Sequence, residues 1–333
     1  MNILKIILIT LCFCLSIVNS NANAQTITYG DGELFQGKYG KLYFEAEGQG
    51  TPVVLINGGP GAGHAVFLGW FDFLLKNGYQ VVYFDETGRG RATREVVGKA
   101  LTPQMGVDDL ESLRLHLKAD KLILLAHSYG GIQGLQYALQ YPQHVEKLIM
   151  VDASYDAKSH QMNIDHVKHV TKTKYPERWE QVLTLRANKV KSTDNRYSKL
   201  LSVGSDMYWY DLKKRKTMRK VRTGDKRDGS NIQVYFDIIG DDPEWQVNGT
   251  LSGLQVESKL KAFNVPTLII GGRHDKITTP EIVHRLYSMM PKNIATKVMF
   301  EKSGHWPWVE ETEKFELSIT TFLTNAPNES LTK

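Results

Sequence analysis

The stretch Leu122-Ile123-Leu124-Leu125-Ala126-His127-Ser128-Tyr129-Gly130-Gly131 decides the fold of this chain. It begins as a continuous apolar run, reaches a serine between small residues, and continues in a helical pattern through Tyr141. That order predicts a buried strand, a tight turn and a helix, with the Ser128 hydroxyl at the apex of the turn. Such a turn strains the serine backbone and needs small neighbours, and Ala126 fits where the Gly-x-Ser-x-Gly pattern has its first glycine. Ser128 is therefore the predicted nucleophile, and an ordinary strand-to-helix turn containing a serine is the alternative.

A serine hydroxyl becomes a nucleophile when a base takes its proton and an acid orients the base. In sites built on this kind of turn, the acid and then the histidine follow the serine along the chain. A buried strand that starts at Val265 runs into a glycine turn carrying Asp275. The strand at 296–300 leads into a loop that bears His305 before the last helix. His274 is the rival base, but beside Asp275 on a tight turn it should point elsewhere, so we predict a triad of Ser128, Asp275 and His305.

A glycine-rich loop follows another buried strand, at 53–56, and reads Asn57-Gly58-Gly59-Pro60-Gly61. Glycines allow backbone N–H groups to approach a developing negative oxygen without a side chain in the way. The second donor in such sites is the N–H directly after the nucleophile. We therefore predict an oxyanion hole formed by the N–H groups of Gly59 and Tyr129, against the alternative of a plain Gly-Pro loop.

The remaining pattern alternates buried strands with helices, which indicates an α/β fold with a mostly parallel sheet flanked by helices. A length of 333 residues with 41% hydrophobic residues suits a core with an insertion. The core is expected at 25–156 and 257–325. The charged, helix-rich interval 157–256 breaks the alternation and is expected to form a helical lid over the carboxyl edge of the sheet, and 326–333 reads as a polar tail. The expected elements are a hairpin at 33–47, strands at 52–56, 80–84, 121–125, 145–151, 265–270 and 296–300, and helices at 66–77, 108–117, 129–141 and 311–322.

The first residues predict export rather than structure. Lys5 is followed by an apolar run at 6–18 and then by Ala22-Asn23-Ala24, a small-x-small pattern. This is typical of a signal peptide at 1–24, cut after Ala24, and predicts a secreted or periplasmic protein. Both cysteines, Cys12 and Cys14, lie in that segment, so the mature chain would have neither a catalytic thiol nor a cysteine-ligated metal. No metal and no cofactor is expected.

Net charge is +5, a mild balance that does not point to nucleic acid. The exception is a run of nine lysines and arginines at 213–227. It is either a solvated face or a contact with an anionic surface of the cell envelope or with an acidic substrate.

Together these motifs resemble the proline iminopeptidase family of serine aminopeptidases, α/β-hydrolases that include the tricorn-interacting aminopeptidases. The similarity runs from about residue 32 to 323. The loop at 57–61 resembles the family's His-Gly-Gly-Pro-Gly, with Asn57 replacing histidine. Asp85-Glu86-Thr87-Gly88-Arg89-Gly90 is similar to its Asp-x-x-Gly-x-Gly turn. Gly240-Asp241-Asp242-Pro243-Glu244-Trp245 resembles its Gly-Pro-x-Glu-Phe stretch, which implies that Glu244 binds the free α-amino group of a substrate.

One position departs from the family. Lys276 stands directly after Asp275, where relatives often have a second glutamate. A lysine there would repel an ammonium group or bind a substrate carboxylate. The resemblance implies a serine hydrolase that removes an N-terminal residue, proline in particular, from short peptides, and the signal-peptide pattern predicts its export. The alternatives are an esterase or carbon–carbon bond hydrolase with the same triad, or a ligand-binding protein built on the hydrolase fold.

Overall fold

The computed structural model describes residues 32–96, 98–201, 205–218, 227 and 229–325. The predicted signal peptide at 1–24 and the polar tail at 326–333 lie outside the described residues, as does most of the second half of the basic run at 213–227.

Eight strands form one sheet in the order β1-β2-β4-β3-β5-β6-β7-β8. The first two pairings, β1 with β2 and β2 with β4, are antiparallel, and the others are parallel. The mostly parallel α/β sheet predicted from the sequence is therefore confirmed. Its strands are β1 (Glu33–Gln36), β2 (Lys41–Glu47), β3 (Pro52–Ile56), β4 (Gln80–Asp85), β5 (Leu122–His127), β6 (Val145–Val151), β7 (Thr267–Gly272) and β8 (Ala295–Phe300).

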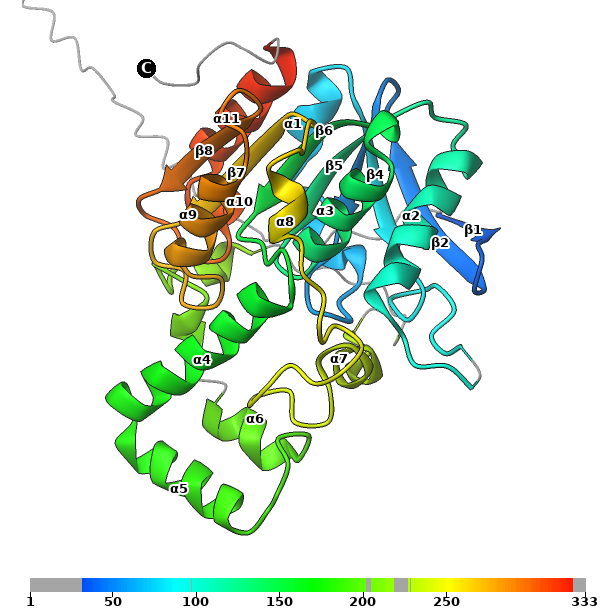
Figure 1. Cartoon of the computed structure of the whole chain (residues 1–333). Coiled ribbons are helices and arrows are strands. Elements are labelled where there is room, and N and C mark those ends of the chain that lie inside the picture. Colours follow the sequence, from blue (N-terminus) through cyan, green and yellow to red (C-terminus); the bar gives the residue numbers. More distant parts are fainter. Residues whose placement is uncertain (1–31, 97, 202–204, 219–226, 228, 326–333) are drawn as a thin grey trace, which may run out of the picture.

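The central strands contain continuous apolar runs because both faces of the sheet are covered. On β5, Leu124 and Ala126 belong to one buried cluster, whereas Ile123 and Leu125 belong to another on the opposite face. A strand buried on both faces has no polar alternation. The flanking helices, on either side in Figure 1, are α1 (Asp72–Lys76), α2 (Pro103–His116), α3 (Gly130–Gln140), α8 (Glu257–Leu260), α9 (Pro280–Met289), α10 (Pro307–Glu310) and α11 (Thr312–Thr324).

Two helix predictions need correction. The helix expected at 66–77 is two short pieces, a 3-10 turn at His64–Phe67 and α1, because Gly69 between them has a φ of +71°. The helix expected at 108–117 starts earlier, at Pro103. The Thr102 side chain caps it by accepting a hydrogen bond from the Met105 N–H at 3.3 Å, and proline suits the first helical position.

The chain leaves the sheet after β6 and returns to it at β7. Between them lie α4 (Ala157–Lys174), α5 (Pro176–Ala187), α6 (Asn195–Leu201) and α7 (Ile232–Ile239), with 3-10 turns at Ser205–Met207 and Lys214–Thr217. Figure 1 shows α4 to α7 beyond one edge of the sheet, apart from the helices that flank its faces. Because α4 begins six residues after β6 ends, this is the edge at the carboxyl ends of the strands. The described part of the insertion contains helices and loops but no strand.

Candidate active site

Ser128 occupies a strained turn between β5 and α3. Its φ is +56°, a left-handed conformation that non-glycine residues rarely adopt. Its N–H donates to Val151 O at 3.1 Å, and its carbonyl accepts from the Ser154 N–H at 3.1 Å, so the end of β6 holds the turn. A Cβ on Gly130 would lie 2.6 Å from Asn57 O. The strain and the crowding explain why a small residue follows the Ser128–Tyr129 pair.

Asp275 and His305 meet beyond the ends of β7 and β8. His305 Nδ1 lies 2.7 Å from Asp275 Oδ2, and both side chains are buried. The other carboxylate oxygen of Asp275 accepts from the N–H groups of Ile277 at 2.7 Å and Thr278 at 3.1 Å. Burial lowers the pKa of His305 to about 3, so the ring is neutral at pH 7. With its Nδ1–H directed at Asp275, the ring keeps Nε2 free to accept a proton.

The His305 loop docks against the strand that carries the serine. The ring of His127, the residue before Ser128, has its centroid 4.6 Å from that of His305, and its Nε2 lies 3.1 Å from His305 O. The three residues of the predicted triad are thereby gathered at one edge of the sheet. His274 is exposed and packs on Tyr210 at 4.4 Å between ring centroids, so this rival histidine points away.

The glycine loop after β3 lies directly against Ser128. A Cβ on Gly58 would be 2.9 Å from Ser128 Cβ, and Gly59 has a φ of +110° and lines the same cavity as Ser128. Among the described residues, neither the Gly59 N–H nor the Tyr129 N–H has a hydrogen-bond acceptor. Both backbone donors remain available, as an oxyanion hole requires.

Arg89 is a site residue that the sequence reasoning missed. Its guanidinium is buried, pairs with Glu86 at 2.8 Å, and donates to the carbonyls of Asn57 at 3.1 Å and Gly58 at 3.2 Å. It also lies over the Tyr129 ring, 5.4 Å from its centroid. Arg89 thus fixes the carbonyls of the glycine loop on the side away from the cavity. The sequence held a sign of this role, because Arg89 belongs to the Asp-x-x-Gly-x-Gly turn. The sequence does not show, however, which segment of the chain this turn contacts.

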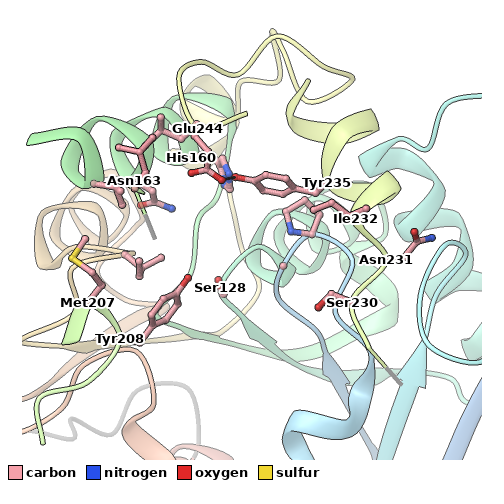
Figure 2. Close-up of a pocket in the computed structure, with 16 residues that line it drawn as sticks. Ser128, His160, Asn163, Met207, Tyr208, Ser230, Asn231, Ile232, Tyr235 and Glu244 are labelled. Atoms are coloured by element: carbon pink, nitrogen blue, oxygen red, sulfur yellow. Dashed lines mark hydrogen bonds between the residues drawn. The ribbon is translucent and has the colours of Figure 1, made fainter. Parts of the chain in front are cut away.

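A cavity of about 370 Å³ opens above Ser128, between the sheet and the insertion. Figure 2 shows Ser128 on its sheet side and Glu244 and Tyr235 on the side of the insertion. Glu244 Oε1 accepts from the Tyr235 hydroxyl at 3.2 Å, and burial raises the pKa of Glu244. Most of the wall between them is apolar, formed by Ile164, Val167, Leu201, Met207, Ile232 and Ile277.

Glu244 is held by its neighbours in the insertion. Its N–H donates to Ser192 Oγ at 2.9 Å, and the Ser192 N–H donates to Asp242 at 2.9 Å. Asp242 also pairs with Arg186 at 2.6 Å, and Arg186 lies over the Trp245 ring. These contacts fix the backbone on both sides of Glu244, so its carboxylate has a defined position in the cavity.

Lys276 does not have the place that the sequence suggested. It is absent from the cavity lining. Its Nζ donates to Asp206 O at 3.0 Å and its N–H to Met207 O at 3.2 Å. The expectation that Lys276 would face a substrate ammonium or carboxylate is therefore wrong, because its ammonium group donates to a backbone carbonyl of the insertion.

Within the described residues no group of three or more His, Cys, Asp or Glu side chains could hold a metal ion. No helix in this part of the chain is long and apolar enough to cross a membrane.

The chain belongs to the alpha/beta hydrolase fold family, whose model matches residues 51–312. Its relatives within that class include proline iminopeptidases, which confirms the resemblance read from the motifs. It is 28% identical to the proline iminopeptidase of Clostridioides difficile (strain 630), over 85% of this chain and 94% of that protein. It is 29% identical to that of Saccharolobus solfataricus, over 86% of this chain and 88% of the other.

Solved structures agree on the fold. The crystal structure of VinJ superposes with a TM-score of 0.72 at 24% identity, covering 88% of this chain and 97% of the other. A proline iminopeptidase of Mycobacterium smegmatis superposes with a TM-score of 0.70 at 20% identity, with the same coverage.

Proposed function

We propose that this protein is a serine hydrolase that removes an N-terminal residue from short peptides through an acyl-enzyme. The observation that carries the proposal is one cavity with Ser128 on one side and the partly buried carboxylate of Glu244 on the other. A hydrolase of unblocked N-termini must attack a carbonyl close to an ammonium group. A carboxylate in a desolvated pocket recognises that ammonium by a charge-assisted hydrogen bond.

In this mechanism Ser128 Oγ attacks the carbonyl carbon of the N-terminal residue while His305 takes its proton. Asp275 keeps His305 in the required tautomer and stabilises the imidazolium that forms. The N–H groups of Gly59 and Tyr129 bind the oxyanion of the tetrahedral intermediate. His305 then gives the proton to the departing amine. Water, activated by the same histidine, releases the N-terminal amino acid from Ser128.

The second candidate is an esterase or carbon–carbon bond hydrolase that uses the same residues. The mostly apolar wall of the cavity favours it, because such a wall also accepts an acyl chain without an amine. The two candidates differ in what Glu244 does and agree on Ser128. A protein that only binds its ligand would have no use for either the strained serine or the oriented histidine.

Labelling with a fluorophosphonate probe tests the serine hydrolase directly. We expect wild type to be labelled at Ser128, and Ser128→Ala to lose both the label and several orders of magnitude in kcat, since members of such a triad act as a unit. Ser230→Ala is the matched control, because this serine lines the same cavity and has no role in the mechanism. Labelling that persists in Ser128→Ala would show that another residue is the nucleophile.

A further inference from the structure

The segment Asp206–Asp211 of the insertion, which we call the strap, crosses the site. It contacts the loop that carries Asp275 and the loop that carries His305. Met207 and Tyr208 line the cavity over Ser128, and Figure 2 shows the Tyr208 ring directed into it. The strap is therefore at once a wall of the substrate cavity and a neighbour of the catalytic base.

The contact with His305 is close and made mainly by backbone atoms. The His305 N–H donates to Tyr208 O at 2.8 Å, and the two rings meet edge to face at 5.6 Å. A Cβ on Gly304 would lie 2.4 Å from Tyr208 O. The strap can approach the base this closely only because residue 304 is a glycine.

Two charged side chains fasten the strap. Lys276, next to Asp275, donates from Nζ to Asp206 O at 3.0 Å. Glu310 on α10 accepts from the N–H groups of Tyr210 at 2.9 Å and Asp211 at 2.8 Å, and its other oxygen accepts from the Gly304 N–H at 2.6 Å. The strap is thus held by Lys276 at one end, by His305 in the middle and by Glu310 at the other.

We propose that the strap positions His305 for catalysis and that Lys276 is a positioning residue that holds the strap against the triad. This rests on the proposed function, since it takes His305 as the base. It gives Lys276 a role in the site although its ammonium never reaches the cavity. The strap would then have two roles, because it forms a wall of the substrate cavity and also positions the base.

The acid limb of the pH profile reports whether the base is disturbed. Burial lowers the pKa of His305, and the strap supplies part of that burial. A loosened strap admits water, so the pKa of His305 rises toward its ordinary value of 6.5 and the acid limb of kcat/KM moves to higher pH. The titratable groups that surround His305 are Asp275, with Asp152 behind it, His127, Glu310 and Tyr208.

The experiment compares Lys276→Met with Lys314→Met, using hydrolysis of p-nitrophenyl acetate between pH 4 and 9. Lys314 Nζ also donates to a backbone carbonyl, Met299 O at 2.7 Å, but lies away from the cavity. We expect Lys276→Met to lower kcat about tenfold and to move the acid limb to higher pH. Lys314→Met should keep the wild-type profile, and Lys276→Arg should recover most of the loss because it keeps a donor.

Wild-type kcat and an unmoved acid limb in folded Lys276→Met would overturn the proposal. Should Lys276→Met fail to fold, Glu310→Gln tests the same claim, since its amide has only one oxygen for the N–H groups of Gly304 and the strap. An inactive wild type would instead sink the proposed function itself, and the two failures are therefore distinguishable.

Discussion

Strained and buried residues concentrate at the ends of β5, β6 and β7. Ser128 and Asp152 both have left-handed backbones, with φ of +56° and +44°, and each directly follows its strand. Such strain persists only where the surroundings impose it, and it collects at functional sites. Here it lifts the Ser128 hydroxyl out of the sheet, toward the cavity.

Asp152 stands behind the triad acid and was not singled out in the sequence. Its Oδ1 accepts from the Gly272 N–H at 2.7 Å, and its carboxyl is fully buried. Burial raises the pKa of both carboxyls well above the usual range, and the charge of Asp275 raises that of Asp152 further, whereas the N–H groups of Ile277 and Thr278 counteract burial at Asp275. We therefore expect Asp152 to hold its proton, so that one negative charge, on Asp275, faces His305. Sequence could not reveal this pair, because its members lie 123 positions apart along the chain.

At the scale of elements, the end of β4 is tied to the segment that follows the glycine loop. Buried His64 lies with its Nδ1 3.0 Å from Asp85 Oδ2 and its Nε2 3.4 Å from Glu45 Oε1. Asp85 also accepts from the N–H groups of His64 at 2.9 Å and Arg91 at 3.0 Å. The two carboxylates outweigh the cost of burial and raise the pKa of His64 to about 9. His64 is thus positively charged at neutral pH.

This ion pair makes stability depend on pH. The pKa of His64 is higher in the folded state, so its contribution is complete below about pH 6.5 and is lost as pH rises through about 9. It amounts to at most about 3 kcal/mol. We expect the difference in Tm between wild type and His64→Gln to be several degrees at pH 6 and to shrink by pH 10. A constant difference in thermal melts over that range would contradict the charge assigned to His64.

The sequence predicted the strands well because β3, β5 and β7 each contain a continuous apolar run, which is typical of a sheet covered on both faces. It failed at 66–77, where the helical pattern continues through Gly69 and only the positive φ there breaks the helix. The ends of the predicted strands identified Ser128, Asp275 and His305 as the candidate triad. The sequence could not place Arg89, Glu310 or the Nζ of Lys276, because their partners are backbone atoms of distant segments.

At the scale of the whole molecule, the hydrolase core and the insertion share the site. The core supplies Ser128, Asp275 and His305, and the insertion supplies Glu244 and the strap. Substitutions around Glu244 are therefore expected to change substrate preference, and those of the triad or of the strap that supports it to change the rate for every substrate.

We also propose export of the mature chain, from the signal-peptide pattern at 1–24. Cleavage after Ala24 would give an N-terminus at Gln25 and a protein without cysteine. Mass spectrometry of active protein recovered from the cell envelope or the medium should find that terminus. Active protein that still begins at Met1 would exclude cleavage at this site.

The central claim is that Glu244 recognises a substrate ammonium next to the carbonyl that Ser128 attacks. The most direct measurement is kcat/KM of wild type and Glu244→Gln on two matched anilides, one of an N-terminal amino acid and one lacking only the α-amino group. A charge-assisted hydrogen bond contributes about 1.5–3 kcal/mol, so we expect Glu244→Gln to lose roughly tenfold to hundredfold on the amine substrate. It should leave the substrate without an amine nearly unchanged. Equal losses on both substrates would contradict amine recognition by Glu244 and favour the esterase.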